Sequence, residues 1–191
     1  MGRYAATIGE SMKTIFEISL CCVLSLFCSH FALAQSSKTT DPCGDPVVES
    51  QSFHVVYGKV VKVEDGDTVI ISLKGRKLRR VNLIGIDAPE RSEAFTKASH
   101  LLLESLVNGR NIEVWVNDNK WIGRQMPAEI AGVVHLRNIE MLDVNLLMIQ
   151  SGMARHKKSE PYSMSNYIEC HYARAEEDAR AARRGLWRGA A

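Results

Sequence analysis

Short runs of β-branched and apolar residues, separated by turn residues, dominate the chain from Val55 onward. Runs bounded in this way are typical of β-strands. The first three are Val55–Val63, Thr68–Leu73 and Leu78–Ile86. Asp65-Gly66 separates the first two and Lys74-Gly75-Arg76 the next two, and both are hairpin turn signals. The pattern therefore predicts a three-stranded antiparallel meander.

A helical pattern and two further strands follow the meander. Ser92 can cap a helix in which apolar residues recur at helical spacing to about Val107, where Asn108-Gly109 is a stop signal. Two later β-branched runs predict a fourth and a fifth strand, Ile112–Val116 and Ala128–Leu136.

Two helices are predicted near the end of the chain. Asp143 can cap a short helix that runs through Gln150 and ends at Gly152. The last helix carries apolar or aromatic residues at steps of four and three, namely Ile168, Tyr172, Ala175, Ala179 and Ala182. Five short strands with one inserted helix and others at the end predict an α+β fold, a five-stranded OB-type β-barrel with about three helices. The strand order does not follow from this pattern.

The first part of the chain is typical of an export signal. Ile15–Leu33 is mostly apolar, and Ala32-Leu33-Ala34 before Gln35 fits a cleavage site of the A-x-A kind. A retained membrane anchor is the alternative interpretation, but Glu17 and His30 interrupt the apolar run.

We therefore expect three segments. Residues 1–34 form a signal peptide, with Met12 as an alternative start, residues 35–53 form a flexible N-terminal arm, and residues 54–188 form one domain. The mature protein would be secreted or periplasmic. We expect a monomer without stable membrane association once the signal is removed.

Cysteines and charge add less information. Three of the five cysteines would leave with the signal, so that Cys43 and Cys170 remain, either as one disulfide or as two free thiols. The formal net charge of +2 is too mild to indicate a nucleic-acid partner by itself. Arg155, Lys157 and Lys158 form a compact basic run, which is either a solvated face or a path for the backbone of a single strand.

Acidic residues stand at two strand ends. Asp65-Gly66-Asp67-Thr68 begins the second strand, and Asp87-Ala88-Pro89-Glu90 follows the third. Each motif alone is compatible with an ordinary turn or helix start. In a meander the two ends can lie side by side, so Asp67 and Asp87 could share one cation through their carboxylates. Pro89 fixes the backbone so that Glu90 stands near that cation, where a general base is needed.

These motifs resemble the staphylococcal nuclease (thermonuclease) family. The resemblance spans roughly Val55 to Trp187 and also includes Val81–Glu90, Gly123-Arg124, Val144-Asn145, Gly152-Met153-Ala154 and Ala179–Trp187.

The resemblance implies a calcium-dependent endonuclease on an OB-type barrel that cleaves DNA and RNA. Carried over by position, Asp67 and Asp87 bind Ca²⁺ through their side chains, and Ala88 binds it through its main-chain carbonyl. Glu90 activates the attacking water. Arg124 pairs with the phosphate and stabilises the charge that develops on it.

One position departs from the family pattern. The family has an arginine five residues before the second metal-binding Asp, where this chain has Asn82. Losing such a donor commonly lowers the rate on the order of 10²–10³-fold. Arg80, two residues earlier, lies on the same face of the strand as Asn82. Its side chain could reach the phosphate in place of the missing arginine, or it is a solvated strand residue. With Arg155 and Lys157, these two residues are the predicted substrate contacts.

Two functions therefore remain open. The first is a secreted or periplasmic, Ca²⁺-dependent endonuclease with DNA and RNA as substrates. The alternative is an OB-fold nucleic-acid-binding module in which Asn82 has weakened catalysis. Cleavage assays on Asn82→Arg and Glu90→Gln variants would separate the two.

Overall fold

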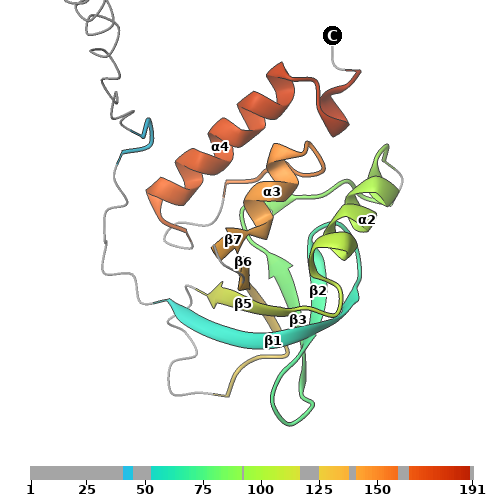
Figure 1. Ribbon diagram of the computed structural model, residues 1–191, viewed down its shortest axis with the longest axis vertical. Coiled ribbons are helices and arrows are strands. Elements are labelled where there is room, and N and C mark those ends of the chain that lie inside the picture. Colours follow the sequence, from blue (N-terminus) through green and yellow to red (C-terminus); the bar gives the residue numbers. More distant parts are fainter. Residues whose placement is uncertain are drawn as a thin grey trace, which may run out of the picture. The chain divides into compact units, whose positions relative to one another are not determined.

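Tight turns join the first three strands, at the places that the turn signals predict (Figure 1). The computed structural model describes residues 41–44, 53–91, 93–116, 125–137, 141–158 and 164–189. In it, β1 (His54–Val63), β2 (Thr68–Ser72) and β3 (Leu78–Leu83) pair in sequence as antiparallel neighbours. The predicted meander is confirmed.

Two later strands close this meander into a ring. β5 (Asn111–Val116) pairs with β1, and β6 (Glu129–Arg137) pairs with β5. β6 also pairs with β3 in parallel, so the strands follow one another around the ring as β3, β2, β1, β5 and β6. The predicted α+β class with a five-stranded OB-type barrel is confirmed. β7 (Met141–Asp143) extends the sheet beyond β6.

Side chains that point inward from alternate positions of the strands fill the interior of this ring. Fully buried β-branched side chains come from each of the five strands, including Val60, Val69, Val81, Val114 and Val134. In β3, Val81 and Leu83 point inward, which leaves Arg80 and Asn82 on the outer face. The hydrophobic core thus fixes which side chains of β3 are available to a site.

Three α-helices lie within the described residues, as predicted: α2 (Thr96–Val107), α3 (Val144–Gln150) and α4 (Asn166–Ala181). The short 3₁₀ helix η2 (Gly185–Trp187) follows α4. α3 packs against α4 and against β6 (Figure 1). None of the helices in the described ranges is long and apolar enough to span a bilayer.

The start of α2 differs from the prediction. Ser92 was expected to cap it, but the helix begins at Thr96 after Phe95, which has a left-handed φ of 70° and makes no side-chain cap bond. The N–H of Glu93 donates to the carbonyl of Glu90 at 2.8 Å, so a separate turn precedes the helix. Ser92 itself lies outside the described residues.

The two later helices follow the sequence pattern closely. The Asp143 carboxylate accepts the Leu146 N–H at 2.9 Å and caps α3 as predicted. α4 buries Tyr172, Ala175 and Ala179, whereas Ala182 is exposed because the helix has ended by that residue.

The predicted third strand, Leu78–Ile86, is divided by a turn. Gly85 has a φ of 77°, and a Cβ there would lie 2.6 Å from the Met164 sulfur, so the turn requires glycine. The chain then continues as β4 (Ile86–Asp87), which leaves the barrel sheet. β4 pairs with β8 (Arg155–His156) in a second, two-stranded sheet that the sequence did not predict.

A disulfide fastens the described part of the N-terminal arm to α4. Cys43 and Cys170 are bonded with their Cα atoms 5.7 Å apart, which settles the open alternative in favour of the bridge. Nearby, the Asp41 carboxylate accepts the Tyr167 hydroxyl at 3.0 Å and pairs with His171 at 3.1 Å. The predicted signal peptide lies outside the described residues.

Asn145 joins α3 to the barrel. Its side chain is fully buried, and its Oδ1 accepts the Val134 N–H at 3.0 Å. Its Nδ2 donates to the carbonyls of Ile84 at 2.8 Å and Gly132 at 3.3 Å. One amide therefore connects α3, β6 and the turn between β3 and β4.

Replacement of Asn145 should destabilise the protein strongly. Asn145→Ala leaves one buried N–H and two carbonyls without this partner, so we expect a loss of roughly 3 kcal/mol in the free energy of unfolding. Asn166→Ala, at an exposed position of α4, should change it by less than about 0.5 kcal/mol. Urea unfolding followed by circular dichroism measures both. Equal stability of the two variants would contradict the role of Asn145.

The disulfide should contribute separately to stability. Replacing Cys43 and Cys170 together by Ser removes a cross-link between residues 127 positions apart, with an expected loss of about 2–4 kcal/mol. Thermal unfolding in the presence and absence of a reductant provides the control. The double variant should be insensitive to the reductant, and a wild type equally insensitive would contradict an accessible, stabilising bridge.

Candidate active site

Main-chain pairing between the start of β2 and the end of β3 brings the two acidic motifs together. Beyond the pair Thr68 and Asn82, the Leu83 N–H donates to the Asp67 carbonyl at 2.8 Å. The Asp67 Oδ2 in turn accepts the Ala88 N–H at 2.9 Å. The first motif is thus bonded directly to the second.

Asp67 and Asp87 open into one surface pocket of about 470 Å³. Asn82, Lys157 and Lys158 also line it, together with Leu83, Ile84, Gly85, Ile86 and Ala131. Of the predicted site residues, the structure therefore gathers Asp67, Asp87, Asn82 and Lys157 around one opening.

Asp67 is the more enclosed of the two carboxylates. Burial raises the pKa of the Asp67 carboxyl, hydrogen bonds from the Ala88 N–H and the Thr68 hydroxyl oppose this, and the neighbouring Asp65 adds to it. The turn before Asp67 is tightly packed, since a Cβ at Gly66 would lie 2.7 Å from the Ala88 Cβ. The position of Asp67 is therefore well fixed, at an energetic cost for its charged form.

Asp87 is half exposed and faces a cation. The Lys157 Nζ lies 3.4 Å from its Oδ1, and the side chains of Asp87 and Lys157 are 49% and 69% exposed. The Lys157 N–H also donates to the Gly85 carbonyl at 3.0 Å, which holds the lysine backbone beside β4. A positive group thus already stands next to one of the proposed metal ligands.

Ala88 and Glu90 differ in exposure. Ala88 is buried, whereas Glu90 is exposed and is not among the described residues that line the pocket. The Glu90 carbonyl accepts hydrogen bonds from the Glu93 N–H and the Thr96 hydroxyl, so its backbone is held while its carboxylate faces solvent.

Asn82 and Arg80 share an acidic partner that the sequence analysis missed. Asn82 donates to Glu129 at 2.6 Å, and an Arg80 Nη lies 3.8 Å from the other oxygen of Glu129. Arg80 also pairs with Glu64 at 2.8 Å. Arg80 is therefore bound to two carboxylates and does not line the pocket among the described residues. Only the parallel register of β3 and β6, which sets Arg80 opposite Glu129, could have revealed this contact.

The remaining predicted residues do not join the pocket in the described structure. Arg155 pairs with Glu93 at 3.1 Å. Arg124, the predicted phosphate ligand, lies outside the described residues.

The donors at the pocket fit a hard cation. The carboxylates of Asp67 and Asp87 offer hard oxygen ligands at this pocket, and water could complete the shell of a divalent cation such as Ca²⁺. Within the described ranges, the side chains of Asp41, Cys43 and His171 also form a group of potential metal ligands, with their ligand atoms within 4.8 Å of one another. The disulfide occupies Cys43 there, so the acidic pocket is the better candidate.

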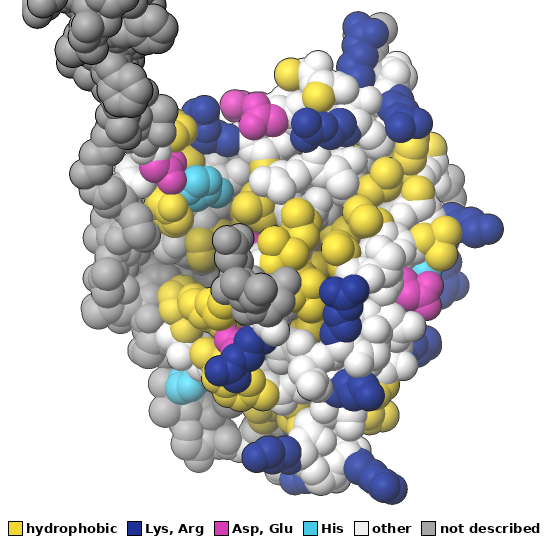
Figure 2. Space-filling view, viewed as in Figure 1, with side chains coloured by type: hydrophobic (Ala, Val, Ile, Leu, Met, Phe, Trp, Pro, Cys, Tyr) yellow, Lys and Arg dark blue, Asp and Glu magenta, His cyan; other side chains and the backbone are white. Residues whose placement is uncertain are grey.

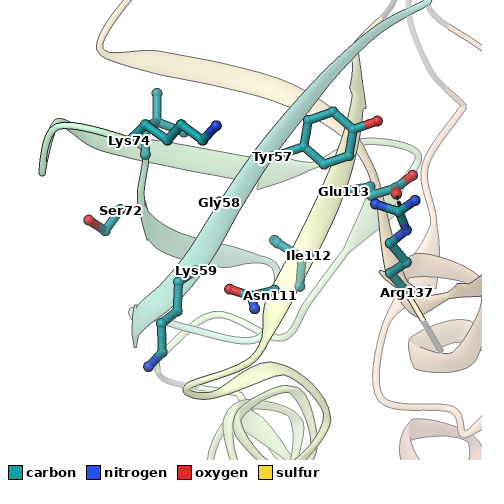
Figure 3. Close-up of a pocket in the computed structure, with 10 residues that line it drawn as sticks. Tyr57, Gly58, Lys59, Ser72, Lys74, Asn111, Ile112, Glu113 and Arg137 are labelled. Carbon is teal, nitrogen blue, oxygen red and sulfur yellow. Dashed lines mark ion pairs between the residues drawn. The ribbon is translucent and has the colours of Figure 1, made fainter.

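A second surface pocket, of about 490 Å³, lies between β1, β2, β5 and β6 (Figure 3). Its described lining holds one acid, Glu113, which pairs with Arg137 at 3.3 Å. On the face seen in Figure 2, Lys and Arg side chains are spread over the surface and form no single patch. This second pocket therefore lacks the paired acids of a metal site among its described lining residues.

Comparison with known proteins places the chain in a family. Residues 80–189 match the model of the family described as "Staphylococcal nuclease homologue". The chain belongs to the staphylococcal nuclease family. The matched region begins at Arg80 in β3 and runs through η2, so it includes Asp87, Glu90 and Lys157.

Curated relatives of this nuclease family support the assignment. An "Uncharacterized endonuclease" of Haemophilus influenzae is 35% identical over 68% of this chain, which spans 65% of the relative's length, a little under two thirds. Another protein of that name in Escherichia coli is 31% identical over 69% of this chain and 77% of its own length. A "Micrococcal nuclease" of Shigella flexneri is 30% identical over 68% and 72%.

The burial of Asp67 should be visible in the stability of the metal-free protein. Because the folded-state pKa is raised, the stability present at low pH is partly lost as pH rises through that pKa and Asp67 ionises. In a chelator at neutral pH, Asp67→Asn should therefore melt higher than the wild type, by on the order of 2 °C. Thermal unfolding at several pH values measures this. The difference should shrink at acidic pH, where the wild-type carboxyl is itself protonated, and a lower melting temperature of the variant at neutral pH would contradict it.

Proposed function

We propose that this protein is a Ca²⁺-dependent endonuclease that hydrolyses phosphodiester bonds of DNA and RNA. Its family and the endonucleases and nuclease among its relatives support a nuclease acting on nucleic acids. The observation that carries the proposal is the joining of the two acidic motifs by the bond from the Ala88 N–H to Asp67, beside Asp87 in one pocket.

Each residue has a distinct part in this proposal. Asp67 and Asp87 would hold the ion through their carboxylates, and Ala88 would contribute its main-chain carbonyl. A bound divalent cation would polarise the phosphate and offset its charge. Glu90, which is solvent-exposed, takes the proton of the attacking water. Arg124 pairs with the phosphate as charge builds on it during displacement.

A binding module is the second candidate, because of the surroundings of Asn82. Its amide already donates to Glu129 at 2.6 Å, and it brings no positive charge to the phosphate. Loss of a charged donor lowers catalysis more than it lowers binding when the donor acts chiefly in the transition state. A protein of this kind would retain single strands without cutting them.

Export is part of the proposal. The apolar segment before Gln35 with its A-x-A site supports it, and so does the Cys43–Cys170 disulfide, because such bridges persist in oxidising compartments. We propose a secreted or periplasmic protein that acts as a monomer.

Glu90→Gln tests the proposal most directly. The variant keeps the size of the side chain but cannot accept the water proton, so kcat should fall on the order of 10²-fold or more. Single-stranded DNA and RNA are incubated with purified mature protein in calcium and in chelator. Glu177→Gln, at an exposed position of α4, removes one charge far from the acidic motifs in sequence and should leave the rate unchanged.

The outcomes separate the two candidates. Calcium-dependent cleavage that is lost in Glu90→Gln supports the nuclease. Strand binding without cleavage, together with cleavage in Asn82→Arg, identifies a binding module derived from a nuclease. Cleavage that persists unchanged in chelator contradicts the proposed role of the metal.

A further inference from the structure

The positive groups near the acidic pocket are not equivalent. Arg80 is bound to Glu64 and Glu129, and Arg155 is bound to Glu93. Neither can reach a substrate in the pocket without giving up these contacts. Of the described residues that line the pocket, the cationic ones are Lys157 and Lys158.

The position of Lys157 is fixed by main-chain pairing. β8 pairs with β4 in antiparallel register, with Arg155 opposite Asp87 and His156 opposite Ile86. The Lys157 N–H then donates to the Gly85 carbonyl at 3.0 Å. The backbone of Lys157 is thereby held next to the strand that carries Asp87, and its Nζ lies 3.4 Å from that carboxylate.

We propose that Lys157 supplies the positive charge at the scissile phosphate that Asn82 no longer provides. This inference rests on the proposed nuclease function. Asn82 and Lys157 line the same pocket as Asp67 and Asp87 but come from different elements, β3 and the residue after β8. A phosphate held there through a cation on the two carboxylates would lie within the space that Asn82 and Lys157 share.

Charge at Asp87 explains how the lysine becomes available. In the structure the Lys157 ammonium pairs with the Asp87 carboxylate at 3.4 Å. If Asp87 held a divalent cation, the Lys157 ammonium would face a like charge and lose its partner, and a phosphate in the pocket would offer it a new one. Lys157 is 69% exposed at its side chain and can turn without disturbing the core.

A lysine would replace an arginine only in part. Its ammonium is a single point charge, whereas a guanidinium can donate two parallel hydrogen bonds to phosphate. Lys157 would therefore stabilise the developing charge without fixing the orientation of the phosphate. Asn82 is an uncharged donor at a position where the family has an arginine. Without Lys157, the site would therefore carry one positive charge less than the family pattern.

The test compares Lys157→Met with the wild type. Methionine keeps an unbranched side chain and removes the charge. We expect kcat/KM for single-stranded DNA to fall on the order of 10- to 100-fold. We expect calcium to bind more tightly, because Asp87 loses its competing ammonium. Isothermal titration calorimetry with calcium alone measures the second effect, and a merely structural loss would weaken both.

Two comparisons make the test specific. Lys77→Met removes another exposed charge, in the turn between β2 and β3, and should leave activity and calcium affinity unchanged. Asn82→Arg, added to Lys157→Met, should restore at least half of the lost activity on a logarithmic scale, because it returns a positive charge to the same pocket.

The inference and the proposed function fail in different ways. A wild type that does not cleave in calcium overturns both. A wild type that cleaves, with Lys157→Met cleaving equally well, overturns the role of Lys157 alone. Reduced activity of Lys157→Met with weakened calcium binding and no rescue by Asn82→Arg also overturns it, since the change would then be structural.

Discussion

The pairing of β2 with β3 is the constraint on which the site depends. It continues past the last paired strand residues through the bond between the Leu83 N–H and the Asp67 carbonyl, so the end of one strand fixes the start of the other. β3 is held on its other side by β6, and Asn145 binds the turn that follows β3. The acidic motifs therefore sit on a backbone that is bonded on both sides.

This rigidity allows the protein to hold charge that would otherwise be unfavourable. Asp67 is kept partly buried, and burial raises the pKa of its carboxyl, which disfavours the charged form. Asp87 is balanced by Lys157, and Arg80 is balanced by Glu64 and Glu129. Asp87, Lys157 and Arg80 therefore each face a group of opposite charge. A charged ligand would have to take the place of one of these partners.

Local sequence patterns predicted the barrel well because each strand shows its own alternation and each turn its own signal. The caps at Asp143 and the apolar face of α4 are local for the same reason. The turn at Gly85 was not predicted, because it lies within the run Leu78–Ile86, which was predicted as a single strand. The contact that excludes a side chain at Gly85 comes from Met164, which is distant in sequence. Strand order and the parallel contact of β3 with β6 were also beyond reach, because they depend on distant segments.

The site divides along the same line. Asp67, Asp87, Ala88 and Glu90 could be singled out because they belong to two short motifs on consecutive strands. By contrast, Asn82 contacts Glu129 across 47 positions, and Lys157 contacts Asp87 across 70. The contact of Arg80 with Glu129 is also between distant residues. No periodicity within one element contains that information. Sequence therefore indicated the acids and left the partners of the basic and amide side chains undetermined.

The pairing of β4 with β8 also bears on the order in which the pocket is assembled during folding. Asp67 and Ala88 are 21 residues apart and can meet as soon as the first hairpins form, whereas Lys157 joins Asp87 across 70 residues. Contacts that close long loops form later than local ones as a rule. In a nascent chain, the two acidic motifs would thus come together before Lys157 reaches Asp87. In this fold, the two acidic motifs belong to one region of the chain, whereas the charge-balanced pocket requires the completed chain.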